Sequence, residues 1–494
     1  MSFPYLSIIV FLPLIGAIVI ALLPGASPRR IKRTAALFTS VAFILSIALF
    51  FMFDRSLAGP QFVEQALWIP SINVQYYLGV DGLSLPMLML TTMLGFIAVL
   101  VSWKIDLRAR EYFAWLLVLE MGILGVFCSL DLLLFFIFWE VELIPMYLLI
   151  SIWGTGRKEY SAMKFVLYTL IGSAMMLAGI LLLYFQAGTF DMVALAGMGL
   201  DSVLSTLTAT AIFFLLFIGY AVKLPVFPLH TWLPDAHTDA PTAVSVILAG
   251  VLLKMGGYAM IRVCVGIFPE TAKDYAPFLV ALAVVGVLYG AAVTLRQTDL
   301  KRLIAYSSIS HMGFVLLGIF ALSQVSMTGA TLQMVSHGII TGLLFALVGL
   351  VYEKTHERMI PNLGGLARRM PVILVVFSIA GLAALGLPST SGFAAEFLVF
   401  LGSFESTAVS GIQIYTIIGI LGVVIGAGYI LWMLQRVFYG PPKAQYDGVP
   451  DADRLEKAYI FALAAVIMLI GIYPAILTDI IKTGVLPLVS SLGL

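Results

Sequence analysis

The segment Lys223-Leu-Pro225-Val-Phe-Pro228 interrupts a long apolar stretch, and Gly386-Leu-Pro388-Ser-Thr-Ser-Gly392 interrupts a later one. Proline has no backbone N–H and cannot continue the hydrogen bonding of a helix. Each segment therefore predicts a helix that is broken within its length. Broken helices at matching positions in two halves of a chain are typical of membrane transporters built from repeats.

The composition places these segments inside a membrane. Of the 494 residues, 61% are apolar and only 11% are charged, with a net charge of +1. A soluble domain is usually about 45–50% apolar and about 25% charged. This composition excludes soluble enzymes, nucleic-acid binders and disordered scaffolds, and the long apolar runs argue against a β-barrel. We predict an all-α, polytopic membrane protein with about 14 transmembrane helices.

The predicted spans are apolar stretches between charged or turn-rich breaks. The amphipathic residues 54–80 between two of them are expected to form a hairpin or short strands at the membrane interface. The first stretch is interpreted as a span and not as a cleavable signal peptide, because its basic residues follow it. The spans cover residues 3–23, 34–53, 81–103, 112–130, 132–150, 160–185, 207–228, 243–268, 276–295, 299–322, 329–353, 371–403, 411–438 and 457–480.

The distribution of basic residues predicts the orientation of the chain. If the N-terminus lies outside and the spans alternate, 20 of the 27 Lys and Arg residues fall in inside loops, and three fall outside. Cytoplasmic loops carry an excess of Lys and Arg, so this arrangement satisfies the positive-inside rule. Both termini are therefore expected outside.

The two broken spans, the seventh and the twelfth, predict an inverted repeat. They are five spans apart, and because five is odd the two repeats have opposite orientations. The expected regions are three N-terminal helices with a periplasmic hairpin, a first repeat, an inverted second repeat, and a cytoplasmic loop with the last helix. They cover residues 1–111, 112–268, 276–438 and 439–494.

Ionisable residues at membrane depth are the candidate functional groups. Each costs about 2.5–3.5 kcal/mol at a helix centre, so such residues usually face a protein interior or a water-filled path. Their order on consecutive inner spans indicates a proton relay more than a single binding pocket. They are Glu120, Glu140, Glu142, Lys164, Lys223, Lys254, His311, His337 and Glu396.

Several of these residues allow two interpretations. Glu140 and Glu142 lie about 200° apart on a helix, so one faces the pathway and the other a neighbouring helix, a subunit or the interface. Pro145 lies near both and does not choose between them. Lys164 either joins the path or extends to the cytoplasmic surface. The segment after the first break contains His230, Asp235 and His237. These side chains either line a cytoplasmic entrance or cap a helix.

The chemistry that fits such a row is proton transfer. Burial disfavours the charged form of a lysine, and a nearby carboxylate restores it, while histidine exchanges protons near neutral pH. The chain has no Walker loop, dinucleotide motif or hydrolytic triad. Cys128 and Cys264 occur without any CxxC motif and cannot hold an iron–sulfur cluster by themselves. The hydroxyl neighbours of His311 and His337 disfavour a bis-histidine haem, so we expect no cofactor and no metal in this chain.

Several strings resemble the antiporter-like subunits of respiratory complex I, NADH-quinone oxidoreductase. The resemblance covers about residues 80–480. The strings are Phe135-Phe-Ile-Phe-Trp139-Glu140, Pro145-Met-Tyr147, Ala221-Val-Lys223-Leu-Pro225, Pro228-Leu-His230-Thr-Trp232-Leu-Pro234-Asp235-Ala-His237, Leu253-Lys254, Ser307-Ser-Ile-Ser-His311-Met-Gly313 and Gln333-Met-Val-Ser336-His337-Gly338.

The resemblance implies roles for particular residues. It places Glu140, Lys223, Lys254 and Glu396 on a proton-pumping axis, with His311 and His337 bridging its two halves. Glu120 and Glu142 lie outside the family's core pattern. The acidic Glu396 favours the M-type subunits, because the L-type and N-type subunits and the Mrp homologues typically have lysine there.

The resemblance also implies the wider setting. The chain would be a subunit of a proton-translocating NADH:quinone oxidoreductase in the bacterial inner membrane, with both termini periplasmic and no redox centre of its own. FMN, iron–sulfur clusters and quinone would belong to other subunits, and subunits L and N would be neighbours. The alternatives are an Mrp-type cation/proton antiporter, or a membrane subunit of a photosynthetic complex I or of a hydrogenase.

Overall fold

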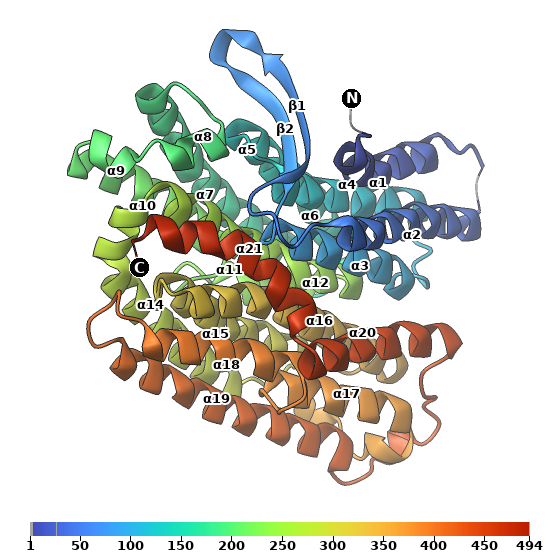
Figure 1. The fold of residues 1–494 in the computed structure, drawn as a ribbon. Coiled ribbons are helices and arrows are strands. Elements are labelled where there is room, and N and C mark those ends of the chain that lie inside the picture. Colours follow the sequence, from blue (N-terminus) through green and yellow to red (C-terminus); the bar gives the residue numbers. More distant parts are fainter. Residues whose placement is uncertain (1–2, 26, 494) are drawn as a thin grey trace.

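The computed structural model describes residues 3–25 and 27–493, and these fold into a bundle of long helices (Figure 1). Thirteen helical segments among these residues are long and apolar enough to cross a membrane. The shorter helices α17 and α18 together form one further, broken span, so the predicted all-α fold with about 14 spans is confirmed.

The first half of the bundle contains the spans before residue 270. Its elements are α1 (Tyr5–Leu22), α2 (Pro28–Met52), α3 (Ser84–Val101), α4 (Ala109–Cys128), α5 (Leu132–Val141), α6 (Leu143–Trp153), α7 (Lys158–Ala187), α10 (Thr206–Lys223), α11 (Trp232–Asp239), α12 (Thr242–Ile247), η2 (Leu248–Leu252), α13 (Leu253–Ala259) and η3 (Met260–Val265). Together, α12, η2, α13 and η3 make one continuous span.

The second half contains the remaining spans and a C-terminal helix. Its elements are α14 (Pro269–Leu295), α15 (Leu300–Phe320), α16 (Gln324–Thr355), α17 (Pro371–Ala384), α18 (Ser391–Glu405), α19 (Ile412–Leu434), η6 (Gln435–Tyr439), α20 (Arg454–Ile472) and α21 (Ala475–Ser491). Short 3-10 turns occur in its loops: η4 (Ile360–Asn362), η5 (Leu366–Arg368) and η7 (Ala444–Tyr446).

The segment between α2 and α3 forms a β-hairpin, as its amphipathic sequence predicts. Strand β1 (Gln61–Ile69) pairs antiparallel with β2 (Val74–Val80), and the short turn η1 (Pro70–Ile72) joins them. The hairpin projects beyond the ends of the helices at the top of Figure 1. The short helices α8 (Met192–Gly197) and α9 (Leu200–Val203) connect α7 to α10.

The C-terminal region differs from the single span predicted over residues 457–480. Helix α20 ends at Ile472, and α21 begins at Ala475, after Tyr473 and Pro474. In Figure 1 the red α21 runs across the front of the bundle. It packs directly on the start of α3, since a Cβ added at Gly82 would lie 2.1 Å from the carbonyl oxygen of Ile480.

The two broken spans share one local geometry. After α10, Val226 N–H donates to the carbonyl of Ala221 at 2.9 Å, and after α17, Leu387 N–H donates to the carbonyl of Leu382 at 3.0 Å. Each bond spans five residues instead of four, so the helix ends in one wide turn. The chain then unwinds before α11 and α18, and the unwound backbone lies inside the protein, where polar groups can be satisfied.

Helix α11 is a buried half-helix, although its proline and charged residues suggest a loop. All of its residues are buried. It begins after a short unwound segment and completes the seventh span. The predicted end of that span at residue 228 therefore marks only its first half.

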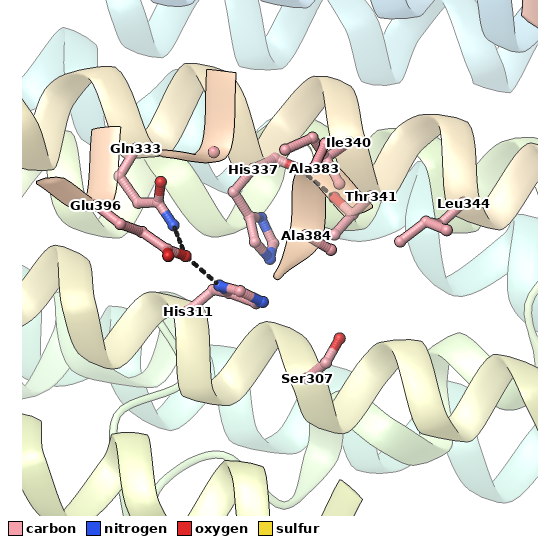
Figure 2. A pocket seen from close by; sticks show the side chains of 11 residues that line it. Ser307, His311, Gln333, His337, Ile340, Thr341, Leu344, Ala383, Ala384 and Glu396 are labelled. Atoms are coloured by element: carbon pink, nitrogen blue, oxygen red, sulfur yellow. Dashed lines mark hydrogen bonds and ion pairs between the residues drawn. The ribbon is translucent and has the colours of Figure 1, made fainter. Parts of the chain in front are cut away.

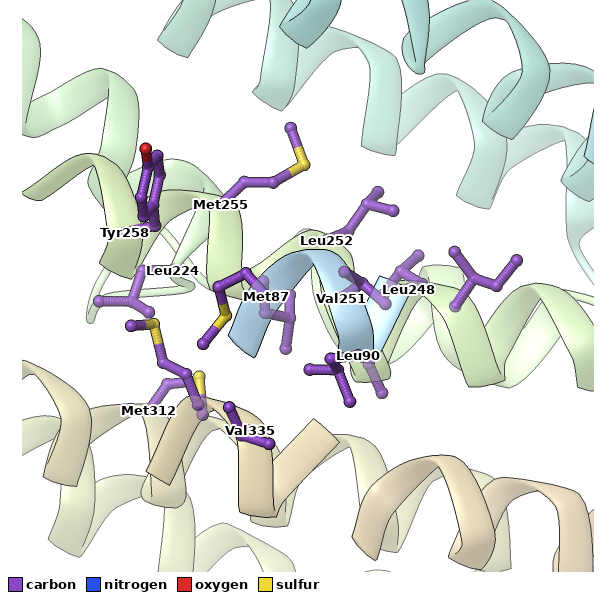
Figure 3. Close-up of a cluster of buried hydrophobic side chains, with 14 of the residues drawn as sticks. Met87, Leu90, Leu224, Leu248, Val251, Leu252, Met255, Tyr258, Met312 and Val335 are labelled. Atoms are coloured by element: carbon purple, nitrogen blue, oxygen red, sulfur yellow. The ribbon is translucent and has the colours of Figure 1, made fainter. Parts of the chain in front are cut away.

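The most buried helices are those that carry the central ionisable residues. The span α12–η3 and helix α16 are buried along their full apolar windows, and α15 nearly so. An apolar cluster fills the space between them, with Met87 from α3, Leu224 after α10, and Met312 and Val335 from α15 and α16 (Figure 3). These contacts fill the space between the helices with apolar side chains.

A charged cluster joins three helix ends on the opposite side from the hairpin. Lys104 donates to Glu353 and, at 2.8 Å, to Glu456, and Lys354 also lies 2.8 Å from Glu456. Burial lowers the pKa of Lys104, but its hydrogen bonds to the two carboxylates outweigh this and leave the pKa above its usual value. The cluster ties the end of α3 to α16 and α20.

Candidate functional site

The first buried ion pair of the site joins Lys223 to Glu142. Lys223 is the last residue of α10 and is 1% exposed, and its ammonium donates to a carboxylate oxygen of Glu142. The rings of Trp139 and Phe165 each lie 5.5 Å from the lysine nitrogen. Lys223 therefore sits in a pocket of one carboxylate and two aromatic faces.

The resemblance places Glu140 on the axis, whereas the structure gives Lys223 a different partner. Glu140 is only partly buried, and its Oε1 has no hydrogen-bond partner among residues 3–25 and 27–493. Glu142 was outside the predicted axis. The signal that could have found it is the stripe Trp139, Glu142 and Met146, whose spacing of three and four residues places all three on one helix face, and all three are buried.

The second group of the site is Lys254, at the centre of the eighth span. It is fully buried and lies between the two π-helical segments η2 and η3. Such segments are frequent at functional sites, because the wider turn leaves carbonyl groups free for other donors. The Lys254 ammonium donates to the carbonyl of Ala249 and lies 2.8 Å from Nδ1 of His337.

Two histidines and a carboxylate continue the row from Lys254. The rings of His337 and His311 have centroids 5.4 Å apart. Nδ1 of His311 lies 3.2 Å from Oε1 of Glu396, and Gln333 donates to the same oxygen at 3.4 Å (Figure 2). Lys254, His337, His311 and Glu396 thus form one chain of neighbouring side chains from four different spans.

A small cavity separates the two histidines and reaches Glu396. Its volume of about 10 Å³ is lined by Ser307, His311, Gln333, His337 and Glu396, among others. A cavity of that volume holds about one water molecule. In the part of the chain that the structure describes, Nε2 of His337 and Oε1 of Gln333 have no partner. These atoms are suited to bind a water that bridges the rings.

The gap between Lys223 and Lys254 is closed by close packing. A Cβ added at Gly256 would lie 2.6 Å from the carbonyl oxygen of Tyr220 and 2.7 Å from the nitrogen of Leu224. The absence of a side chain at Gly256 lets α13 approach the end of α10. The surrounding side chains are apolar, among them Leu224, Leu252 and Met255 (Figure 3). A proton that passes between the two lysines therefore needs water to enter this gap.

A polar cavity lies at the other end of α11 from the break. Its volume is about 350 Å³, and Asp235, Asp239, Arg302 and Arg358 help to line it. The ammonium of Lys164 lies 2.7 Å from Oδ2 of Asp235. Lys164 is thus paired at the edge of this cavity, and Asp235 lines it.

His237 lies behind the polar cavity and is fully buried. Its ring stacks on Phe345 with centroids 4.5 Å apart. Neither ring nitrogen has a partner among residues 3–25 and 27–493. The ring is within electrostatic reach of both Lys301 and Lys254. His237 precedes the cavity-lining Thr238 and Asp239 along α11, while His230 stacks with Phe227 nearer the break.

The candidate Glu120 and the buried ion pair of Arg262 lie apart from the row. Glu120 is buried against Gly95 of α3, where an added Cβ would lie 2.4 Å from its carboxyl carbon. Arg262 pairs with Asp81 at 2.6 Å near the start of α3. Within residues 3–25 and 27–493, no three His, Cys, Asp or Glu residues are grouped so as to hold a metal ion.

Known proteins share both the sequence and the fold of this chain. The family described as NADH:quinone oxidoreductase/Mrp antiporter, TM, matches residues 129–425, which is more than half of the chain. The chain belongs to this family. The resemblance drawn from the motifs around Glu140, Lys223, Lys254, His311 and His337 is thereby confirmed at the level of the family.

Individual members of the NADH:quinone oxidoreductase/Mrp antiporter family match over nearly the full length. NADH-quinone oxidoreductase subunit M of Rhodobacter capsulatus is 43% identical, over 98% of this chain and 96% of its own. NAD(P)H-quinone oxidoreductase chain 4 of Gloeobacter violaceus is 42% identical, over 97% of this chain and 91% of its own.

A solved structure has the same fold. A chain of respiratory complex I from Thermus thermophilus, solved with bound NADH, superposes with a TM-score of 0.88 at 29% identity, over 98% of this chain and 99% of its own. The names of these relatives favour a quinone oxidoreductase subunit over an Mrp antiporter, as the acidic Glu396 predicts.

Proposed function

We propose that this chain is the antiporter-like, proton-translocating membrane subunit of an NADH-quinone oxidoreductase, and that quinone reduction elsewhere in the complex drives it. The flavin, iron–sulfur clusters and quinone site belong to other subunits. The proposed axis consists of Glu140, Lys223, Lys254, His337, His311 and Glu396. The observation that carries the proposal is the contact series from Lys254 through both histidines to Glu396.

Each group in that series can change its charge by one proton. A buried lysine beside a histidine shares a proton with it easily, because burial disfavours the ammonium and brings its acidity closer to that of imidazolium. Histidine has two ring nitrogens, so it can accept a proton on one side and release it on the other. Glu396 then accepts a proton from His311, to which it is already hydrogen-bonded.

The polar cavity beside α11 is the proposed entrance from the cytoplasm. It lies among loops that carry the excess of basic residues, which is the cytoplasmic side by the positive-inside rule. His237 is next in the chain to the cavity-lining Thr238 and interacts electrostatically with Lys254. Protons would enter from the cavity, pass His237, and join the row at Lys254.

The proposed partners are the neighbouring antiporter-like subunits L and N. Glu140 supports this assignment, because it is a partly exposed carboxylate on a helix face that also carries the 59% exposed Ile144. Contact of a carboxylate with lipid at membrane depth costs several kcal/mol. A neighbouring protein that covers this face and supplies a polar partner to Glu140 removes that cost.

The proposed localisation is the bacterial inner membrane, with both termini on the periplasmic side. We expect a reporter enzyme that is active only in the cytoplasm to stay silent when fused after Leu494. The same reporter inserted in the basic loop after Thr355 should be active and serves as the control. A strong signal from the C-terminal fusion would contradict the proposed orientation.

The function is tested by replacing Lys254 with methionine, which has a similar length but no charge. We expect proton uptake coupled to quinone reduction in reconstituted vesicles to fall by about 100-fold, in the range that a positioned proton-transfer group contributes. Assembly and flavin content should not change.

Lys32→Met is the matched control. Lys32 is also a buried lysine, but it pairs with the exposed Asp106 at one end of α2, away from the row. We expect normal pumping from this variant. Normal proton uptake by Lys254→Met would contradict the proposed function.

A further inference from the structure

The last turn of α19 presents an arginine stacked on a tryptophan. Arg436 lies in η6, which ends this span, and its guanidinium carbon is 3.9 Å from the centroid of the Trp432 ring. The aromatic face attracts the cation and covers one side of its plane. Nε of Arg436 is buried and has no partner among residues 3–25 and 27–493. A charged donor group is therefore held in a fixed plane without an acceptor.

The six arginines between residues 296 and 436 fall into two groups. One group is paired with carboxylates of the protein: Arg302 with Asp235, Arg358 with Asp299, and Arg369 with Asp447. The other group forms no ion pair within the residues that the structure describes: Arg296, Arg368 and Arg436. Helix α14, which ends just before Arg296, packs against α19, and η5, which ends at Arg368, packs against η6. The unpaired cations thus lie on neighbouring elements.

Two loops in contact fix the position of η6. The ammonium of Lys443, after α19, donates to the carbonyl of Pro361 at 2.8 Å. In the same place, a Cβ added at Gly364 would lie 2.7 Å from the carbonyl oxygen of Pro441. The loop before α17 and the loop after α19 therefore pack directly on each other, and Arg436 is presented from a structured surface.

The flank of α19 that leads to Arg436 is apolar and exposed. Val424 is 66% exposed and Trp432 is 46% exposed. Between them, Gly428 leaves a notch, since an added Cβ would meet only Leu295 of α14, at 3.9 Å, in the described part of the chain. Residues four positions apart lie on one face of a helix, so the notch, the ring and the cation follow one line. In Figure 1, α19 runs along the lower edge of the bundle.

This arrangement matches the chemistry of an anionic phospholipid. The planar guanidinium suits a phosphate group, tryptophan is enriched at the level of lipid headgroups, and the apolar flank suits an acyl chain. Three unpaired cations disfavour a headgroup that carries its own ammonium, such as choline. Basic pockets on the cytoplasmic side of membrane proteins bind anionic headgroups in this way.

We propose that Arg436 and Trp432 form a binding site for one anionic phospholipid, with its phosphate on the guanidinium and an acyl chain along Gly428 and Val424. Arg296 and Arg368 add positive charge beside the headgroup. The proposed orientation of the chain places this site in the cytoplasmic leaflet. The inference rests on the proposed function only for the name of that leaflet, and it does not involve the proton path.

The test uses phosphatidylglycerol with a photoactivatable diazirine on its acyl chain, in phosphatidylcholine vesicles that contain the intact complex. The complex is kept without NADH and quinone, so the outcome is independent of pumping. We expect the peptide with Gly428 and Trp432 to take more label from this probe than from a phosphatidylcholine probe with the same chain. Equal labelling by both probes would overturn the proposal, and so would no labelling by either, because a protein would then cover the flank.

Arg436→Gln removes the cation and keeps a polar side chain. We expect labelling by the phosphatidylglycerol probe to fall at least about 10-fold, as loss of a hydrogen bond to a charged group predicts. Arg108→Gln is the matched control, because Arg108 also faces a tryptophan, 5.8 Å from the ring of Trp153, but is paired with Glu111. It should leave the labelling near Trp432 unchanged. Wild-type labelling in Arg436→Gln would contradict the site.

Gly428→Leu tests the site without changing its charge, and it decides the matter if Arg436→Gln does not assemble. Leucine occupies the notch and leaves Arg436 in place, so we expect the label on this peptide to fall several-fold. Undiminished labelling would overturn the proposed acyl position and with it the site.

Excess inorganic phosphate distinguishes a lipid from a free anion. We expect the preference for phosphatidylglycerol to persist in its presence, because the acyl chain holds the lipid at the site. Loss of that preference would assign the guanidinium to free phosphate and overturn the lipid site.

Discussion

Replacing Lys223 with arginine will stop proton pumping nearly as completely as replacing it with alanine. Arginine keeps the positive charge but does not lose its proton in proteins. A relay needs a group that alternates between charged and neutral forms, so a permanent cation blocks it. We expect both variants to reduce quinone-coupled proton uptake by about 100-fold.

Lys32→Arg is the control for the change in shape. This lysine is also buried but is paired with Asp106 at the surface, and we expect normal pumping from its arginine variant. Near-normal pumping by Lys223→Arg would show that Lys223 only anchors Glu142 by its charge.

Replacing Glu396 with glutamine will interrupt the other end of the row. Glutamine keeps the size of the side chain and its contact with Gln333 and His311, but it cannot accept a proton from the histidine. We expect proton uptake to fall by roughly 100-fold. Assembly, judged by a native gel, and cofactor content should be unchanged.

The control for Glu396 is Glu120→Gln on α4. Glu120 is also a buried carboxylate, and its Oε1 is unpaired in the described part of the chain. It lies against Gly95 of α3. We expect its variant to pump normally. Full pumping by Glu396→Gln would reduce Glu396 to a packing residue between α18 and α15.

The architecture follows from patterns that are local in the sequence. Apolar stretches of about 20 residues indicate spans, and Pro225 and Pro388 mark the two helix breaks in advance. Lys254, His311, His337 and Glu396 were also predictable, because an ionisable residue in an apolar helix is costly without a function. The structure adds that these four are direct neighbours.

The partner of Lys223 was harder to predict. The sequence shows that Glu140 and Glu142 face opposite ways, but not which way is inward. The motif around Glu140 suggested that residue, whereas burial of Trp139 and Met146 turns Glu142 toward the lysine. The choice depends on how α5 packs against α10 and α4, and those contacts join residues far apart in the chain.

The buried half-helix α11 and the separate α21 were missed for similar reasons. Pro234, Asp235 and Asp239 look like loop residues by local propensity, yet the contacts of α11 with α7 and α15 bury the whole segment. Helix α21 was read as part of the last span because residues 473–480 continue its apolar pattern. The turn at Pro474 redirects the chain, and packing on α3 fixes its course.

The depth of the row has an electrical consequence. Lys254, His311 and His337 lie near the middle of their spans, and Glu396 is hydrogen-bonded to His311, so the row runs roughly parallel to the membrane surface. Moving one elementary charge through a potential of 100 mV requires about 2.3 kcal/mol, but only for motion across the membrane. Sideways transfer along the row does almost no work against the voltage. In the proposed pathway, the opposing voltage would therefore act on two legs, from the polar cavity to Lys254 and from Glu396 to the outer surface.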